Sequence, residues 1–129
     1  MDTVAQRTVL RFEKTVTSLE KALKLGELPE HAERDAVLLR FELTAELMPK
    51  VLQRILSERG AAPALPKDVV RSARAADIVG ENEASTLLAV IDDRNRMVHD
   101  YSEGYAVELL RKVTIEYAPV LRALVNQIR

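Results

Sequence analysis

Residues 37–56, VLLRFELTAELMPKVLQRIL, carry apolar side chains three and four positions apart along their whole length. This spacing gathers Phe41, Val51 and Leu52 on one face of an α-helix, and it predicts a helix from about residue 31 to residue 59. Gly60 is the expected stop at its C-terminal end. Pro49 lies inside the pattern and lacks a backbone N–H, so we expect either a kink or a break between two shorter helices.

The same spacing continues on both sides of this segment. It predicts helices over residues 3–25, 82–98 and 102–128 and a short helix that begins at Pro66. Asn82 and Ser102 are candidate N-caps, and Pro119 is expected to bend the last helix. No alternating β pattern of useful length occurs. We therefore expect a single all-α domain over residues 1–129, an up-and-down antiparallel bundle of four long helices and one short helix.

The second helix carries more apolar side chains than one small bundle can cover. Its first turns contain apolar residues on several sides, and this surplus predicts a helix-mediated homodimer. The residues concerned are Val37, Leu38, Leu39, Phe41 and Leu43.

Composition excludes several classes of protein. The chain has no Cys and only two His, which excludes disulfide scaffolds and thiol catalysis and argues against a multi-histidine metal site. The formal net charge is −1, so a general basic coat for nucleic acid is absent. The longest apolar run, Leu87–Ile91, is too short to cross a membrane, and the N-terminal residues lack the order of a secretion signal. Together with the missing Cys, these features favour a cytoplasmic protein.

Residues 92–101, DDRNRMVHDY, carry the chemistry. On a helix, Arg94 falls on the inward stripe formed by Leu87, Ile91 and Val98, where the pattern calls for an apolar residue. A buried Arg needs a carboxylate, a phosphate or an open cleft. On the neighbouring face lie three further polar residues, which place a His close to a cation at the end of the helix: Asp92, Asn95 and His99. Helix-end carbonyls favour a protonated His, which suits an acid.

The spacing Arg94-Asn95-x-x-x-His99-x-Tyr101 resembles the signature of HEPN domains in the HEPN–MNT toxin–antitoxin group. The wider pattern is similar to the family of nucleotidyltransferase substrate-binding proteins over residues 7–125. Three further stretches carry this similarity: 40–42 (RFE), 66–71 (PKDVVR) and 92–95 (DDRN).

The resemblance implies a metal-independent ribonuclease that needs no cofactor, with its cleft at a two-fold interface. His99 is then the general acid or base, Arg94 holds the scissile phosphate, and Asn95 orients the phosphate or fixes the helix. A partner MNT nucleotidyltransferase is expected to transfer AMP onto Tyr101 and so block RNA. Arg96 and three cations of the short helix are candidate RNA contacts: Lys67, Arg71 and Arg74.

Each of these residues also has a structural interpretation. Arg94 can pair with Asp92, Asp93 or Glu83 at a dimer interface, and His99 can satisfy carbonyls at the helix end. Tyr101 can be a packing residue, and the cations of the short helix can form a solvated face. Tyr105 and Tyr117 are expected in the core and His31 at the surface.

Three functions therefore remain open at the level of sequence. The first is a toxin ribonuclease neutralised by its cognate nucleotidyltransferase. The second is a non-catalytic subunit that binds nucleotide or substrate for a nucleotidyltransferase. The third is an interaction scaffold without a ligand. The near-neutral charge favours the second slightly, because it offers RNA little long-range attraction.

Overall fold

Helices account for most of residues 3–129, the part of the chain that the computed structural model describes. No strand occurs in these residues, which confirms the expected all-α class. In chain order the elements are α1 (Val4–Leu23), η1 (Pro29–His31), α2 (Ala32–Glu58), α3 (Pro66–Ala75), α4 (Glu81–Met97), α5 (Glu103–Lys112), η2 (Val113–Tyr117) and α6 (Ala118–Ile128).

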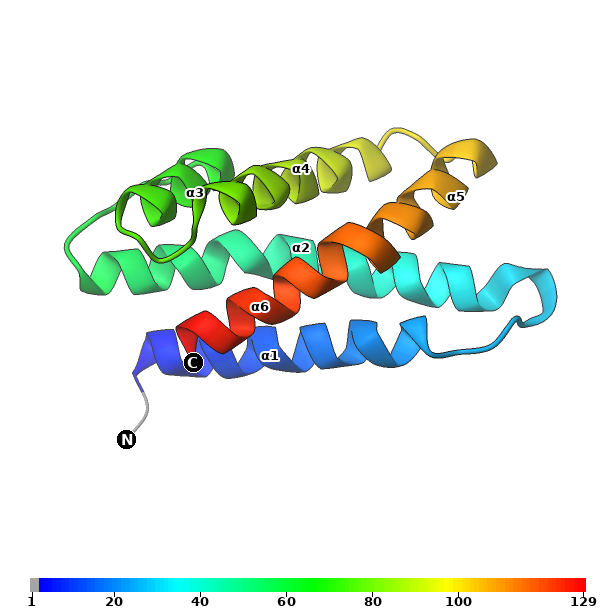
Figure 1. Ribbon diagram of the computed structural model, residues 1–129, viewed down its shortest axis with the longest axis horizontal. Helices are drawn as coiled ribbons and strands as arrows, with labels where there is room; N and C mark the ends of the chain where they lie inside the picture. The colour runs from blue at the N-terminus through cyan, green and yellow to red at the C-terminus, as the bar shows by residue number, and fades with distance from the viewer. Residues whose placement is uncertain (1–2) are drawn as a thin grey trace.

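Figure 1 shows α2 lying between α1 on one side and the pair α3 and α4 on the other. The last helical run, α5–η2–α6, leaves the end of α4 and crosses the bundle obliquely to reach α1. Apolar side chains from all of these helices meet in one core. The largest fully buried members include Phe12, Phe41, Met48, Leu52, Leu87 and Leu121.

Local sequence signals fix most helix ends. The side chain of Thr3 caps α1, and that of Ser102 accepts a hydrogen bond from the backbone N–H of Tyr105 to cap α5, as expected. Gly60 ends α2 at φ +84°, with the backbone hydrogen bonds of a Schellman motif. The expectation for Asn82 is wrong, because α4 begins at Glu81 with Gly80 at the N-cap position.

The two internal prolines are accommodated differently. Helix α2 continues through Pro49, so the expected break does not occur. Pro119 is the second residue of α6 and lies just after η2, a π-helical segment in which the turn widens. Proline cannot donate to the carbonyl four residues earlier and its ring crowds that group, so a wider turn just before it relieves the clash.

The apolar surplus of α2 is divided between the core and the surface. Val37 and Phe41 are buried, whereas Leu39 and Leu43 are 58% and 52% exposed. Two more exposed aliphatic side chains, Val107 and Ile115, lie on the last helical run. Within residues 3–129, no helix combines the length and apolar character needed to span a bilayer.

Candidate functional site

The candidate residues lie where α4 ends and turns into α5. Arg94 and Asn95 occupy the last turn of α4, which ends at Met97, and His99 follows in the turn. The backbone N–H groups of His99 and Asp100 both donate to the carbonyl of Arg96, at 3.0 and 2.9 Å. This bonding holds the chain close to the helix end, so His99 remains near the last helical carbonyls.

Arg94 is half-buried and weakly paired. Its guanidinium lies 3.8 Å from the carboxylate of Glu46 on α2, and one third of its side chain is exposed. The Nε atom of Arg94 is buried without a hydrogen-bond partner. Within the chain, the carboxylate that faces Arg94 thus comes from α2 and not from Asp92, Asp93 or Glu83 of α4.

The inward stripe of α4 also ends earlier than expected. Leu87 and Ile91 are buried, but Val98 is 45% exposed. The reason is that α4 stops at Met97, so Val98 begins the turn and no longer faces the core. Arg94 is therefore the last member of the stripe, at the boundary between core and solvent.

Asn95 and His99 are both exposed. Asp92, expected on the same flank, is exposed and forms an ion pair with Lys67 of α3 at 2.6 Å. The carboxylate of Asp92 is thus engaged by α3. The candidate amide and imidazole are thus both open to solvent.

A small polar cluster organises the turn itself. Nε and Nη2 of Arg96 donate to Asp100 at 3.1 and 3.0 Å, and the guanidinium lies 4.1 Å from the ring centre of Tyr105. Asp100 also accepts hydrogen bonds from the hydroxyl and backbone N–H of Ser102, which with Arg96 lower the pKa of that carboxyl. Arg96, predicted as an RNA contact, is thus engaged in holding the turn.

Tyr101 is the most accessible large side chain of the turn, at 87% exposure. Its hydroxyl donates to the carbonyl of Val98 at 2.9 Å, so the ring folds back over the turn that contains His99. The interpretation as a packing residue does not hold, because a packed ring loses most of its exposure.

Asp93 is the residue that sequence reasoning missed as part of this region. Only 6% of it is exposed, and it accepts hydrogen bonds from the hydroxyls of Tyr105 and Tyr117, the former at 2.8 Å. Lys112 lies 3.7 Å away on α5. Burial and the adjacent carboxylate raise the pKa of both tyrosines above its ordinary value. This cluster ties the end of α4 to α5 and η2, and it confirms both tyrosines as core residues.

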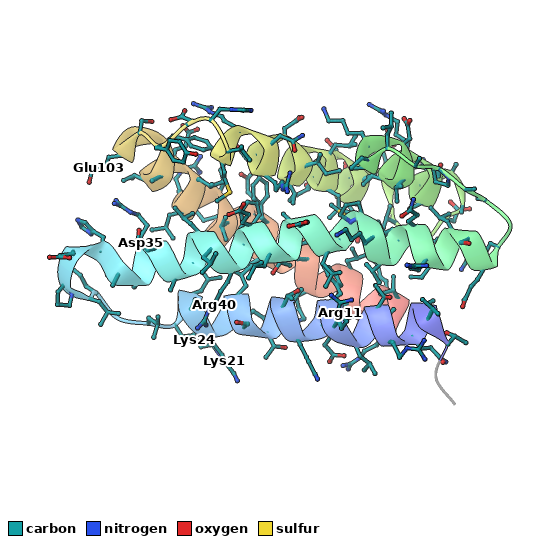
Figure 2. The ribbon with its side chains drawn as sticks, turned by 180° about the vertical axis from the view of Figure 1, so that it is seen from behind. Arg11, Lys21, Lys24, Asp35, Arg40 and Glu103 are labelled. Carbon is teal, nitrogen blue, oxygen red and sulfur yellow. The ribbon has the colours of Figure 1, made fainter. Side chains whose placement is uncertain are left out.

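The three cations predicted on the short helix lie near α4, but each has an acidic neighbour. Lys67 pairs with Asp92, Arg71 with Asp68 at 3.2 Å, and Arg74 with Asp77 at 3.9 Å. Figure 2 shows other cations at the opposite edge of the bundle from α4, where Arg11, Lys21 and Lys24 project from α1. Each cation of the short helix thus has a carboxylate within 4 Å.

Comparison with known proteins places this geometry in context. Searching the curated proteins gave no match. A crystal structure of a protein from Thermus thermophilus is similar at 36% identity and a TM-score of 0.83, with 92% of this chain and 98% of that chain covered.

Two toxin–antitoxin structures share the fold. A tri-AMPylated HEPN toxin of Shewanella oneidensis, in complex with its MNT antitoxin, aligns at 14% identity and a TM-score of 0.81, covering 99% of this chain and 98% of that one. A toxin–antitoxin structure with AMP-PNP aligns at 13% identity and the same TM-score and coverage. At these identities the likeness establishes an HEPN-like helical fold.

Sequence similarity establishes the family. The model of the family described as nucleotidyltransferase substrate binding protein like matches residues 7–129, nearly the whole chain. With that match and the helical architecture above, the chain belongs to the nucleotidyltransferase substrate-binding-protein-like family.

Proposed function

We propose that this protein is the toxin of a HEPN–MNT pair, a metal-independent ribonuclease that its nucleotidyltransferase antitoxin silences by transferring AMP to Tyr101. The observation that carries the proposal is the open flank of α4. There a half-buried Arg94 with an unpaired Nε lies in the same short stretch as an exposed His99 and an exposed Tyr101 hydroxyl. The two structural neighbours described as toxin–antitoxin proteins support the context.

RNA supplies its own nucleophile, so the chemistry asks little of the protein. A base removes the proton of the 2′-hydroxyl, the 2′-oxygen forms a bond to phosphorus, and the bond to the 5′-oxygen breaks as that oxygen receives a proton. Arg94 binds the phosphate and stabilises the charge that develops on its oxygens. His99 performs one of the two proton transfers.

The second proton transfer is the chemical reason for a homodimer. His31, the other histidine of the chain, lies in η1 before α2, outside the site, so the second imidazole is His99 of another copy. We place the two-fold interface over the exposed aliphatic side chains of α2 and the α4–α5 turn. These include Leu39, Leu43 and Val98, which are each more than 40% exposed. The pair acts in the cytoplasm, where RNA and ATP are both present.

Silencing follows from the position of Tyr101. Its hydroxyl gives up its proton as the phenolic oxygen forms a bond to the α-phosphorus of ATP. The bond from that phosphorus to pyrophosphate breaks, pyrophosphate leaves, and an AMP group remains on the turn that contains His99. The negatively charged phosphate of the AMP group forms an ion pair with Arg94 and repels an incoming RNA strand. Incubation with ATP and the partner should raise the intact mass by one or more AMP units. The Tyr101→Phe variant should show no gain, and a gain that persists in that variant would overturn the assignment.

Growth arrest on expression tests the ribonuclease directly. Wild-type protein without its partner should stop growth, whereas His99→Ala and Arg94→Ala should be harmless at equal protein levels. His31→Asn is the matched control, because it removes the other imidazole and Asn tolerates the left-handed backbone there, at φ +58°. Equal harmlessness of all four proteins, together with intact RNA in the presence of the purified protein, would contradict the proposal.

A second candidate is a non-catalytic subunit that binds nucleotide for a nucleotidyltransferase. The ion pairs of Lys67, Arg71 and Arg74 favour it, because they leave few cations to attract RNA from a distance. In that case the wild-type protein should bind ATP or AMP at Arg94 and leave RNA intact.

A further inference from the structure

A recess of about 290 Å³ lies between α2, α3 and α4, directly beside the candidate site. Arg94 and Asn95 form part of its wall, so anything bound to Arg94 lies at its mouth. Pockets for drug-sized ligands run from about 300 to 1,000 Å³. The recess therefore suits one ring system rather than a whole nucleotide.

The inner surface of the recess is apolar and firmly held. Ala45 from α2, Val69 from α3 and Ile91 from α4 all line it, and each is buried by the packing of the three helices. Pro49 and Pro66 add two rigid, flat-sided rings to the wall. Such a surface receives the face of a planar heterocycle and disfavours a phosphate or a hydrated metal ion, which need polar partners.

The rim of the recess has both hydrogen-bond donors and hydrogen-bond acceptors. The carboxylate of Glu46 accepts hydrogen bonds, the ammonium group of Lys50 donates them, and the amide of Asn95 does both. All three side chains are at least partly exposed, so they can turn toward a ligand. Apolar faces with a mixed donor and acceptor edge are the chemical description of a nucleobase.

Two residues that line the recess each have a polar group without its usual hydrogen-bond partner: one is a backbone carbonyl and the other is a side-chain nitrogen. Pro49 has no N–H, so the carbonyl of Ala45 cannot receive the intrahelical hydrogen bond that residue 49 would normally donate. The Nε atom of Arg94 is buried without a partner. Both groups belong to residues that line the recess, and leaving such groups unsatisfied is unfavourable.

We propose that this recess binds one nucleobase of the RNA strand whose phosphate Arg94 holds, and that it thereby sets the sequence preference of the site. The inference rests on the proposed RNA binding and adds a base-reading subsite to it. Pro49, which interrupts the helical pattern of the sequence, then has a role, because it frees a carbonyl and supplies a flat wall.

The test separates base binding from phosphate binding and from cleavage. Affinity is measured for 2′-O-methyl RNA octamers, which lack the nucleophile and cannot be cleaved, one octamer for each base. An abasic octamer of equal length and charge reports the backbone contribution alone. The blocking variant is Ala64→Trp, because Ala64 is an exposed loop residue that lines the recess. Ala62→Trp is the matched control, an exposed alanine of the same loop outside the lining.

Wild-type protein should bind at least one base-containing octamer about tenfold more tightly than the abasic octamer. Ala64→Trp should reduce that ratio to about one while abasic binding stays the same, and Ala62→Trp should keep the ratio of the wild type. Equal wild-type affinity for abasic and base-containing octamers, or an unchanged ratio in Ala64→Trp, would overturn the subsite alone. Failure of every octamer to bind wild-type protein would remove the proposed RNA binding, and this inference with it.

Discussion

Asp93 and Arg94 are neighbours in sequence, yet their side chains contact different elements: Asp93 faces α5 and η2, whereas Arg94 faces α2. Asp93 is almost fully buried and receives two tyrosine hydroxyls, with Lys112 nearby. Arg94 keeps one third of its side chain exposed and has one long ion pair and an unpaired Nε. One flank is satisfied within the chain, whereas the other leaves hydrogen-bonding capacity for a ligand.

This difference assigns the two residues separate roles, one in stability and one in ligand binding. A buried carboxylate that accepts several hydrogen bonds fixes the position of the backbone around it. Because Asp93 bonds to residues of α5 and η2, it holds the end of α4 against the helical run that follows. We therefore expect the Asp93 flank to govern stability and the Arg94 flank to govern activity.

Replacing Asp93 with Ala should give the largest loss of stability. It leaves the buried Tyr117 hydroxyl without its acceptor and removes one acceptor of the Tyr105 hydroxyl, which keeps the backbone carbonyl of residue 93. It also removes one of the two carboxylates beside Lys112, and we expect the free energy of unfolding to fall by about 3 kcal/mol. Asp92→Ala is the matched control, because it removes only a solvent-exposed ion pair, for a loss of about 0.5 kcal/mol. Urea denaturation measures both variants. Similar losses for the two would contradict the proposed division.

Tyr117→Phe should have an intermediate effect on stability. It removes one of the two hydroxyl donors to Asp93 but keeps the ring, which stacks on Phe41 at 5.6 Å between centroids. We expect the free energy of unfolding to fall by about 1–2 kcal/mol in urea denaturation. A loss as large as that of Asp93→Ala would show that the ring is displaced in the variant.

The same tyrosines predict a smaller dependence of stability on pH. Burial and Asp93 raise the pKa of Tyr105 and Tyr117 in the folded chain, whereas the unfolded chain titrates near pH 10. The unfolded state therefore loses protons first, and stability that is complete below about pH 10 decreases above it. Urea midpoints measured between pH 8 and about pH 11 should show this decrease, and it should be shallower in Tyr117→Phe. An unchanged slope in that variant would count against a buried, neutral Tyr117.

The smallest effect is expected from the cations of α3. Arg71 is paired with Asp68 on an exposed surface, so Arg71→Ala should change RNA affinity less than about twofold. Arg94→Ala should abolish binding in the same assay. A loss on Arg71→Ala comparable to that on Arg94→Ala would mean that α3 guides the RNA after all.

Much of the fold is readable from sequence because its signals are local. Apolar spacing locates the helices, Ser102 and Gly60 mark two of their ends, and Pro66 opens α3. The π-helical segment before Pro119 is not readable in this way, because a single widened turn leaves the apolar spacing nearly unchanged. The sequence also leaves open whether a helix continues through Pro49, because packing of the flanking turns decides this.

The candidate site was predictable in part. A helical wheel shows Arg94 at a position where the pattern calls for an apolar residue. In the structure this residue lies at the edge of the core. Asp92 is exposed whereas Asp93 is buried, and this difference depends on tertiary contacts. Two identical adjacent residues in a sequence do not show which of them is buried. One signal was present, because tyrosines expected in the core need partners for their hydroxyls, and Asp93 is that partner.

The ribonuclease proposal is tested by cleavage of single-stranded RNA with the purified protein in the presence of EDTA. Wild-type protein should cleave the RNA and leave 2′,3′-cyclic phosphate ends. His99→Ala should slow the reaction by about 10²- to 10⁴-fold without changing its urea midpoint. Intact RNA with wild-type protein, or equal cleavage by wild type and His99→Ala, would contradict the account.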